Sequence, residues 1–437
     1  MKTALYIPCF NAQRDIRSCL DAVFSQSRQA DDILVVDDGS SDTTADIAEE
    51  YPVRIIRHAR NLGLAAARNS AIKNTDADLI ASLDSDCLPD KDWFSYLFKR
   101  MEMPNIAGAG GKMTEADTSG LFDKWRSVHM GQHWGNSKRL NPPFLFGSNT
   151  LFRRKLLLSA GSYNEKYRSN YEDVDISIRL RKKGFGLFYE PRAVVKHLKK
   201  DDMFSLLNNF WKWNFTYYIK EGFYKTPERF AFKLKDNIGL SNRFLEEDLT
   251  KKRHRLVYLD FLIALHHSLR DFDYFSFRGK KKSFDIAAPS KMSVWISFLD
   301  LDFFYHWDSA KRKLSTLVPK EKAFQQSFFA LNLILSIFMK SKFGEEKFNE
   351  RLRRHLFMSV FKIEDELLLN KMLNLAGSHQ DWEGLLNKKH PNIDNEFLTI
   401  LSSSFREWVE KLLYRFPGIV KIIKKSAEEA EKTISAA

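Results

Sequence analysis

Two aspartates, Asp84 and Asp86, follow the apolar run 79–83 with one residue between them, and a third acid, Asp90, lies just beyond. The run predicts a short buried strand, and Pro89 ends regular structure soon after it. Carboxylates this close repel each other, so one of them tends to stay protonated unless a cation is bound. The spacing is open to two readings, a divalent-cation site or a solvated turn, because aspartate is also common where strands end.

Other chemistry-bearing motifs lie along the first 200 residues. In chain order they are Pro8-x-Phe10-Asn11, "VVDDGSSD" (35–42), "NLGLAAARN" (61–69), "FGSNTLFRR" (146–154), "YEDVDISIRLRKKGF" (171–185) and "EPRAVVKH" (190–197). The chain has no G-x-G-x-x-G and no Walker A lysine motif, so its sequence gives no support to a dinucleotide or P-loop site.

Residues 1–200 alternate short β-branched runs with stretches of helical periodicity. This alternation predicts βαβ units and a mainly parallel sheet. Ligands of such sheets bind at the carboxyl ends of the strands. Both acidic pairs, 37–38 and 84/86, fall at predicted strand ends, which favours a binding site over a solvated turn.

The composition changes after about residue 200. The remainder holds 26 of the 36 phenylalanines but only 7 of the 19 glycines, and its apolar residues recur at helical spacing. We therefore predict one domain over 1–205 and a largely helical region over 206–437, with 277–292 as a loop. Its aromatic residues beside lysines fill a helical core, stack on sugars or sit at a lipid headgroup layer.

The net charge, the cysteines and the length of the apolar stretches limit the cellular setting and the partners. The net charge of +13 suits nucleic acid, phosphorylated ligands or anionic lipid, and no nucleic-acid module is present, so we expect no nucleic-acid partner. The three cysteines lack paired or metal-type spacing, which is typical of a reducing compartment. The longest apolar stretch, 328–339, is shorter than the ~20 residues of a membrane span. We expect a cytoplasmic protein, with peripheral association at the inner face of the membrane as an option.

The order of these motifs over roughly residues 1–200 resembles the family-2-type inverting glycosyltransferases with a GT-A fold. The resemblance implies an α/β domain, a mainly parallel sheet with flanking helices, followed here by the α-helical region. It also implies an enzyme that moves a sugar from a nucleotide-diphosphate sugar, with UDP as the default, to a hydroxyl. The acceptor is a glycan, a lipid-linked molecule or a protein, and the setting is cell-surface polysaccharide biosynthesis.

The same resemblance assigns the metal ligands. Asp84 and Asp86 hold a divalent metal, Mn2+ or Mg2+, which clamps the leaving diphosphate as a Lewis acid. Asp86 is the surer ligand, and Asp84 more often reaches the ribose or metal-bound water. His197 completes the coordination; the alternative is a surface histidine, since its neighbours are polar.

The nucleotide is assigned to the first strand ends. The resemblance implies that Asp38 accepts hydrogen bonds from the base of the nucleotide. Asp37 is the alternative, because neighbouring strand residues face opposite ways. Arg68 lies near the nucleotide or the strand before Asp84, unless it is a helix-surface arginine. The pocket is shaped by Pro8, Phe10 and Asn11.

Inversion at the anomeric carbon needs a base on the acceptor hydroxyl. The resemblance assigns this base to Asp173 and acceptor binding to Glu172. In "FGSN", Asn149 would bond a sugar hydroxyl and Gly147 would let the backbone approach the sugar. The segment 171–185 also reads simply as a helix whose first-turn acids and last-turn bases suit its dipole.

Two other classes of protein compete with this assignment. A phosphatase of the D-x-D-x-T type places its aspartates on the first strand, whereas Asp84 follows a later one. A non-catalytic sugar-binding or membrane-surface protein on a GT-A scaffold would not need its acids, yet this chain retains each acid that the chemistry uses.

Overall fold

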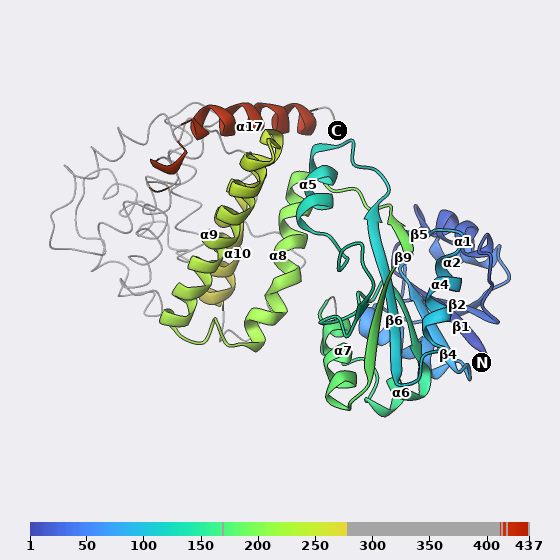
Figure 1. Ribbon diagram of the computed structural model, residues 1–437. Coiled ribbons are helices and arrows are strands. Elements are labelled where there is room, and N and C mark those ends of the chain that lie inside the picture. Colours follow the sequence, from blue (N-terminus) through green and yellow to red (C-terminus); the bar gives the residue numbers. More distant parts are fainter. Residues whose placement is uncertain (168–169, 278–410, 412–413, 417, 436–437) are drawn as a thin grey trace, which may run out of the picture. The chain divides into compact units, whose positions relative to one another are not determined.

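The computed structural model describes residues 1–167, 170–277, 411, 414–416 and 418–435. The chain divides into two compact units, Met1–Lys200 and Asp201–Ala437 (Figure 1). The sequence placed the domain border slightly later, at 205. The expected loop at 277–292, apart from its first residue, and the apolar stretch at 328–339 lie outside the described residues.

The first unit is built on one mixed sheet. Its strands run in the order β3-β2-β1-β4-β8-β6-β9-β5, with β7 paired to β9. The strands β1 to β4 are mutually parallel, β8 is antiparallel to both β4 and β6, and β9 is parallel to β6. The bounds are β1 Thr3–Cys9, β2 Asp32–Asp37, β3 Arg54–Arg57, β4 Leu79–Leu83, β5 Cys87–Pro89, β6 Ile106–Glu115, β7 Arg139–Leu140, β8 Asn149–Arg153 and β9 Gly186–His197.

Helices cover both faces of this sheet (Figure 1), which explains why residues 4–9 of β1 and 33–36 of β2 are apolar on both faces. Successive side chains of β1 point to opposite faces. Leu5 and Ile7 pack with α1 and α4, whereas Ala4 and Tyr6 pack with α3, α6 and α7. The bounds are α1 Ile16–Phe24, α2 Thr44–Glu49, α3 Leu64–Lys73, α4 Trp93–Arg100, α5 Leu121–His129, α6 Arg154–Ser159 and α7 Glu172–Lys182.

The parallel strands bring the polar motifs to one edge. β1, β2 and β4 end at Cys9, Asp37 and Leu83, so the residues that follow them emerge side by side. The register of β5 with β9 pairs Cys87 with His197, which brings the end of β9 to the same edge. This α/β architecture is consistent with the GT-A fold, as predicted, but the sheet is mixed and not mainly parallel, because β5, β7 and β8 all pair antiparallel with their neighbours.

The described part of the second unit is helical, as predicted. Asp202 caps α8 reciprocally with Ser205, and Thr226 caps α9 ahead of a proline in its first turn. No helix among the described residues is long and apolar enough to cross a membrane. The bounds are α8 Met203–Lys220, α9 Pro227–Thr250, η1 His254–Leu256, α10 Val257–Phe277 and α17 Ile419–Ser435.

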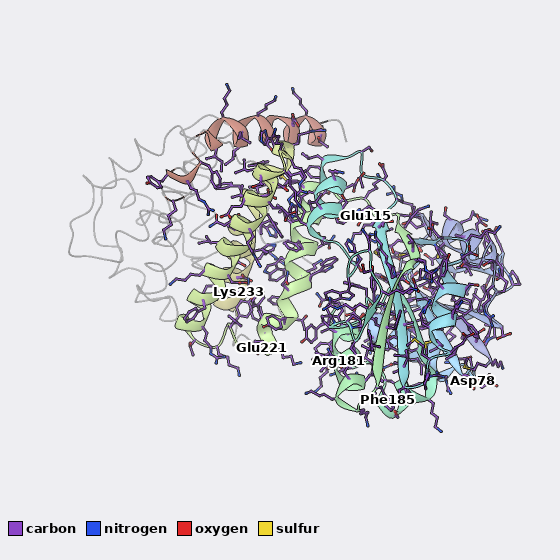
Figure 2. All side chains as sticks on the ribbon, viewed as in Figure 1. Asp78, Glu115, Arg181, Phe185, Glu221 and Lys233 are labelled. Atoms are coloured by element: carbon purple, nitrogen blue, oxygen red, sulfur yellow. The ribbon has the colours of Figure 1, made fainter. Side chains whose placement is uncertain are left out.

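A buried carboxylate ties α8, α9 and α10 together. Asp271 accepts hydrogen bonds from Trp211 Nε1 (2.7 Å), the Tyr224 hydroxyl (2.5 Å) and Asn237 Nδ2 (2.8 Å). The ammonium of Lys233, a residue of α9 labelled in Figure 2, lies 3.0 Å from the same carboxylate and is itself buried. The charge of Asp271 is therefore paired and hydrogen-bonded, as burial requires.

Candidate functional site

Asp84 and Asp86 stand on a short turn between β4 and β5, closed by a hydrogen bond from Cys87 N to Asp84 O (3.1 Å). Both side chains are about one third exposed, so a ligand can reach them from the strand-end edge. Burial is the largest influence on the pKa of Asp84 and raises it against the pull of Arg68. Burial also acts on Asp86, but His197 outweighs it and lowers the pKa of Asp86.

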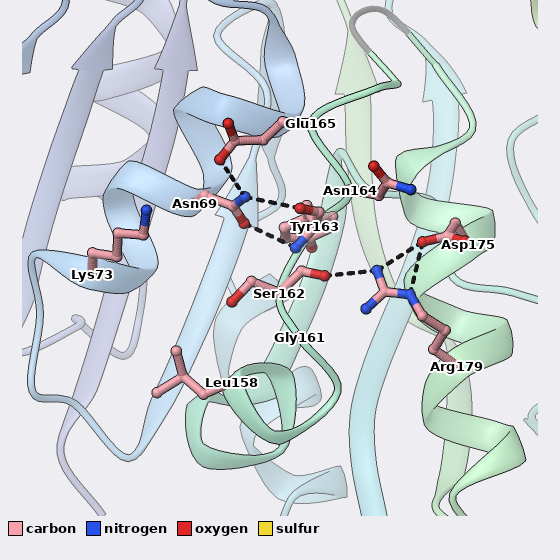
Figure 3. A pocket seen from close by; sticks show the side chains of 10 residues that line it. All are labelled: Asn69, Lys73, Leu158, Gly161, Ser162, Tyr163, Asn164, Glu165, Asp175 and Arg179. Atoms are coloured by element: carbon pink, nitrogen blue, oxygen red, sulfur yellow. Dashed lines mark hydrogen bonds and ion pairs between the residues drawn. The ribbon is translucent and has the colours of Figure 1, made fainter.

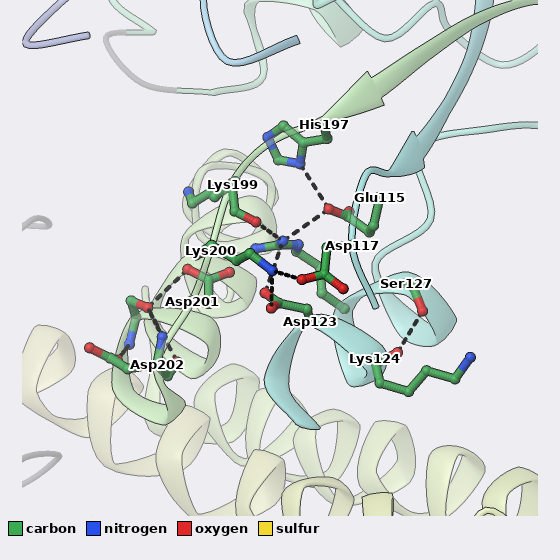
Figure 4. Close-up of polar contacts among 12 residues, drawn as sticks. Glu115, Asp117, Asp123, Lys124, Ser127, His197, Lys199, Lys200, Asp201 and Asp202 are labelled. Atoms are coloured by element: carbon green, nitrogen blue, oxygen red, sulfur yellow. Dashed lines mark hydrogen bonds and ion pairs between the residues drawn. The ribbon is translucent and has the colours of Figure 1, made fainter. Parts of the chain in front are cut away.

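His197 lies between two carboxylates, Asp86 and Glu115, and Figure 4 shows its contact with Glu115. Its Nε2 is 3.2 Å from Asp86 Oδ2, and its Nδ1 is 3.3 Å from Glu115 Oε2. The ring is 9% exposed, which excludes the surface-histidine alternative. Burial lowers its pKa, but the two carboxylates outweigh burial and raise the pKa to about 9. The Nε2–Oδ2 contact is a hydrogen bond, so a cation bound by both groups would have to displace the proton between them.

Glu115 is a site residue that the sequence did not reveal. It ends β6, is buried, and lies 2.9 Å from Arg126 Nη2 as well as against His197. Arg126 in turn donates to the carbonyl of Lys199, two residues beyond His197. Glu115 therefore orients the imidazole from behind, as carboxylates commonly do for metal-binding histidines. Its one signal in the sequence is its place at the end of the segment IAGAGGKMTE, whose first six residues are apolar or glycine.

Arg68 lies under the site with 1% exposure, so the helix-surface alternative is wrong. Its Nη1 donates to Ser82 Oγ of β4 (2.6 Å) and to the carbonyl of Gly147 (2.5 Å). Its Nη2 is 3.3 Å from Asp84 Oδ1, and its Nε is 3.5 Å from Glu172 Oε1. One guanidinium thus contacts both acidic motifs.

Gly147 serves this arginine. A Cβ at position 147 would come within 2.8 Å of Arg68 Nη2, so the missing side chain makes room for the guanidinium. The amide of Gly147 also donates to Asp173 Oδ2 (2.9 Å). The sequence predicted that Gly147 lets the backbone approach the sugar. In the structure its carbonyl accepts from Arg68 and its amide donates to Asp173, so it joins Arg68 to the first turn of α7.

Glu172 and Asp173 open α7 after Tyr171, whose φ of +78° turns the chain sharply into the helix. Glu172 is 3% exposed, and burial, followed by repulsion from Asp173, raises its pKa to about 8. Burial also raises the pKa of Asp173, which remains partly exposed. The two acids therefore differ in access: only Asp173 keeps an open face.

Asp38 is already engaged within the protein. Its carboxylate contacts His58 Nδ1 (2.6 Å) and accepts from the amides of Leu62 (2.9 Å) and Gly63 (2.8 Å). It thereby fixes the loop that leads into α3. Asp37 Oδ1 accepts from Ser40 N (2.9 Å), so both members of the pair order the edge, and base recognition by Asp38 stays a prediction.

The end of β1 supplies a wall beside this pair. Pro8 is buried in the strand, while Phe10 is 50% exposed and offers a ring face at the edge. Asn11 adopts a φ of +52°, and its Oδ1 accepts from the amide of Ser41 (2.9 Å). These positions suit the predicted nucleotide pocket.

Asn149 does not lie where the sequence reading expected. Its Nδ2 donates to the carbonyls of Lys112 and Ala193 (3.1 Å each), and its Oδ1 accepts from Trp93 Nε1 (2.7 Å). The side chain is 1% exposed. Asn149 bonds β8 to its neighbours in the core and has no amide hydrogen left for an acceptor.

Comparison with known proteins relates the N-terminal region to glycosyltransferases. Residues 5–159 match the model of Glycosyl transferase family 2, which confirms the resemblance for the N-terminal region. The poly-beta-1,6-N-acetyl-D-glucosamine synthase of Staphylococcus aureus (strain COL) is 24% identical over 217 residues, 47% of this chain and 52% of that protein. The chain thus spans about half the length of the curated relatives it matches.

Two solved structures are similar at low scores. S. aureus TarS 1-349 gives a TM-score of 0.40 at 14% identity, covering 95% of this chain and 91% of the other. GalNAc-T7 with UDP, GalNAc and Mn2+ gives a TM-score of 0.39 at 15% identity, covering 46% and 44%. The sequence matches, over residues 5–159 to the family model and over 217 residues to the synthase, are what relate this chain to glycosyltransferases.

The buried acid of α7 predicts a pH-dependent stability. Because the pKa of Glu172 is about 8 in the folded chain against an ordinary 4.5, the folded state keeps a proton that the unfolded state releases. This contribution is present below about pH 4.5 and is lost as the pH rises through about 8. Glu172→Gln cannot lose it, so the variant should gain about 4 kcal/mol relative to wild type between pH 5 and pH 9.

Urea unfolding of both proteins at the two pH values measures this difference. Glu102→Gln, at an exposed position of the same unit, is the matched control and should follow wild type. A variant-to-wild-type difference that is equal at pH 5 and pH 9 would contradict the assignment of the proton to Glu172.

Proposed function

We propose that this chain, whose residues 5–159 match Glycosyl transferase family 2, is an inverting glycosyltransferase that uses a nucleotide-diphosphate sugar. One observation carries the proposal. Arg68 joins Asp84 on the donor side to Glu172 and, through Gly147, to Asp173 on the acceptor side. A displacement at a sugar carbon needs these two sides held at a fixed separation.

The donor side fits a divalent metal. Asp84, Asp86 and His197 would hold Mn2+ or Mg2+, since carboxylates suit both ions and the imidazole favours the transition metal. The ion would neutralise the charge that develops on the leaving diphosphate. Asp84 would face the ribose side of the donor, and Glu115 would keep the His197 ring in its orientation.

The nucleotide would occupy the edge formed by Pro8, Phe10, Asn11 and Asp38. The exposed Phe10 ring suits a base, and the buried Asp38 keeps the adjoining loop in place. We take UDP as the nucleotide because of the family resemblance. The name of the poly-N-acetylglucosamine synthase suggests N-acetylglucosamine as the sugar and names no nucleotide.

Asp173 would act as the base. Its carboxylate is held by the amides of Gly147 (2.9 Å) and Val174 (2.7 Å) and has a raised pKa, which moves it toward the working pH of a general base. It would take the proton of the acceptor hydroxyl as the hydroxyl oxygen bonds the anomeric carbon and the bond to the diphosphate breaks. Glu172 is buried and lies against Arg68, so it would support the first turn of α7 from within the core.

The acceptor is proposed to be a hydroxyl of a glycan, a lipid-linked molecule or a protein in polysaccharide biosynthesis, by analogy with the synthase that the chain matches. The second unit would hold that acceptor or a membrane surface. On α8, Trp213 and Tyr217 are 38% and 44% exposed and lie on one helix face, and on α9 Phe232 is 64% exposed. Exposed aromatics in a basic chain suit a headgroup layer.

The metal assignment predicts unequal effects at the paired aspartates. Asp86→Ala, more than Asp84→Ala, should abolish the Mn2+-dependent binding of UDP, because Asp86 and His197 share the proposed ion. Titration calorimetry of UDP with and without Mn2+ measures this. Asp90→Ala is the control, since Asp90 forms a surface pair with Lys196 (3.1 Å) and should bind UDP as wild type does. Unchanged binding by Asp86→Ala would sink the assignment.

The base assignment predicts a separation of binding from transfer. Asp173→Asn is nearly isosteric, so it should bind UDP and Mn2+ normally while transfer falls by about 100-fold or more. A rate close to wild type would contradict the assignment of the base to Asp173. Proton NMR of the product supplies a second check, because a retained anomeric configuration would exclude direct inversion.

The membrane role predicts flotation of the full chain with vesicles that contain anionic lipid and none with neutral vesicles. The electrostatic part of such binding weakens as salt is added. If the chain does not float at low salt, membrane binding by the second unit is excluded, and acceptor binding is left as its proposed role.

A further inference from the structure

The segment after β9 leaves the sheet beside the turn between β4 and β5. Leu198 N donates to Asp86 O (2.8 Å), and this bond continues the antiparallel register of Cys87 with His197 by one residue. Lys199 is the next residue along the chain, so its backbone comes level with the turn itself. A basic residue therefore lies beside the acidic motif of the donor side.

The backbone around Lys199 is held by its neighbours. The carbonyl of His197 accepts from Ala116 N (2.9 Å), and Arg126 donates to the carbonyl of Lys199. Arg126 is itself buried, at 2% exposure, so it is a rigid anchor for this carbonyl. The position of Lys199 is thus fixed, and only its side chain can turn.

The Lys199 ammonium differs from that of the next residue. In Figure 4 dashed lines join the Lys200 ammonium to Asp117 and Asp123, and none reaches the ammonium of Lys199. In the part of the chain that the structure describes, no hydrogen bond or ion pair engages it. Lys199 is nevertheless partly buried, whereas Lys200 is exposed. A cation drawn partly out of water in this way is favourable when an anion pairs with it.

The charge of Lys199 acts on the metal turn. Burial is the largest influence on the pKa of Asp86 and raises it, but the charges of His197 and Lys199 lower this pKa below its ordinary value. The ammonium is therefore near Asp86 without forming an ion pair with it. Its donors remain available to a ligand that binds at the same turn.

The open groove of about 690 Å3 on the face that α3, α6 and α7 cover is a contrasting case (Figure 3). There the Asn69 amide donates to the carbonyl of Tyr163 (2.9 Å), and the Arg179 guanidinium donates to Asp175 Oδ2 (2.8 Å). Those polar side chains are used to hold the fold. Lys199 holds no other side chain, so its ammonium is suited to a ligand.

The chemistry of an ammonium selects an anion. Lysine has N–H donors and no acceptor, and it commonly binds phosphate oxygens as a point charge. The anion that the proposed function brings to Asp84 and Asp86 is the diphosphate of the donor. When the bond to the sugar breaks, this diphosphate gains negative charge, and a fixed cation beside it stabilises the charged leaving group more than the intact donor.

We propose that Lys199 binds the diphosphate of the donor and stabilises it as the leaving group. The proposal rests on the proposed glycosyltransferase function and adds to it a residue outside the metal, nucleotide and base sets. Lys199 supplies a positive charge that belongs to the chain itself, on the same turn that would hold the ion.

Titration calorimetry of UDP with the full chain tests this contact. Lys199→Gln removes the charge at similar length and should weaken the binding of UDP with Mn2+ by about tenfold, equal to about 1.4 kcal/mol. Lys199→Arg keeps the charge and should retain most of the affinity. The matched control is Lys196→Gln on the same strand end. The Lys196 ammonium forms a surface pair with Asp90 (3.1 Å), so this variant should bind UDP as wild type does.

Repeating the titration over a range of Mn2+ concentrations separates a phosphate contact from damage to the metal site. The loss in Lys199→Gln should persist at saturating Mn2+, because removing a positive charge beside Asp86 does not weaken the binding of a cation there. Equal affinity in Lys199→Gln and wild type, an equal loss in Lys199→Arg, or a loss that added Mn2+ restores would each overturn the proposal. Failure of wild type to bind UDP with Mn2+ would instead contradict the proposed function.

Discussion

A single buried guanidinium holds the candidate site together. Arg68 is fixed to β4 through Ser82 and to the loop before β8 through Gly147, and it faces Asp84 and Glu172 from below. A cation buried this deeply is stable only because carboxylates and carbonyls surround it, and removing one partner of such a pair commonly costs about 3–5 kcal/mol. The same contacts set the distance between the two acidic motifs. Stability and site geometry therefore depend on one side chain.

The position of Arg68 follows from the helix that carries it. α3 is rich in alanine, and Ala65, Ala67 and Ala71 are buried against the sheet. Small side chains let the helix lie close to β1, so a long residue on the inner face has no route to water and must find partners inside. Gly147 supplies the remaining space. The "AAARN" motif is thus explained by packing as much as by chemistry.

Apolar runs followed by acids were sufficient to predict the parallel strands and the edge at which Asp37, Asp38, Asp84 and Asp86 meet. Local patterns could not predict long-range pairing. Asn149 follows a loop motif, yet the insertion of β8 between β4 and β6 turns its amide into the core. Glu115 is a lone acid at a strand end, and only the pairing of β6 with β9 brings it to His197. The fold and the paired motifs were readable from sequence, whereas partners that meet through strand order were not.

Charge balance explains why these acids share one edge. The five carboxylates described there belong to Asp84, Asp86, Glu115, Glu172 and Asp173, and the facing cationic groups belong to Arg68, Arg126 and His197. Full ionisation would leave two negative charges in excess. The protein relieves part of this repulsion by protonation, since burial and neighbouring acids raise the pKa of Asp84, Glu172 and Asp173. A divalent cation bound by Asp86 and His197 would relieve it as well, because it would replace the single charge of the His197 proton with two. Because Arg68 contacts both Asp84 and Glu172, a change in the charge of one acid alters the electrostatic surroundings of the other.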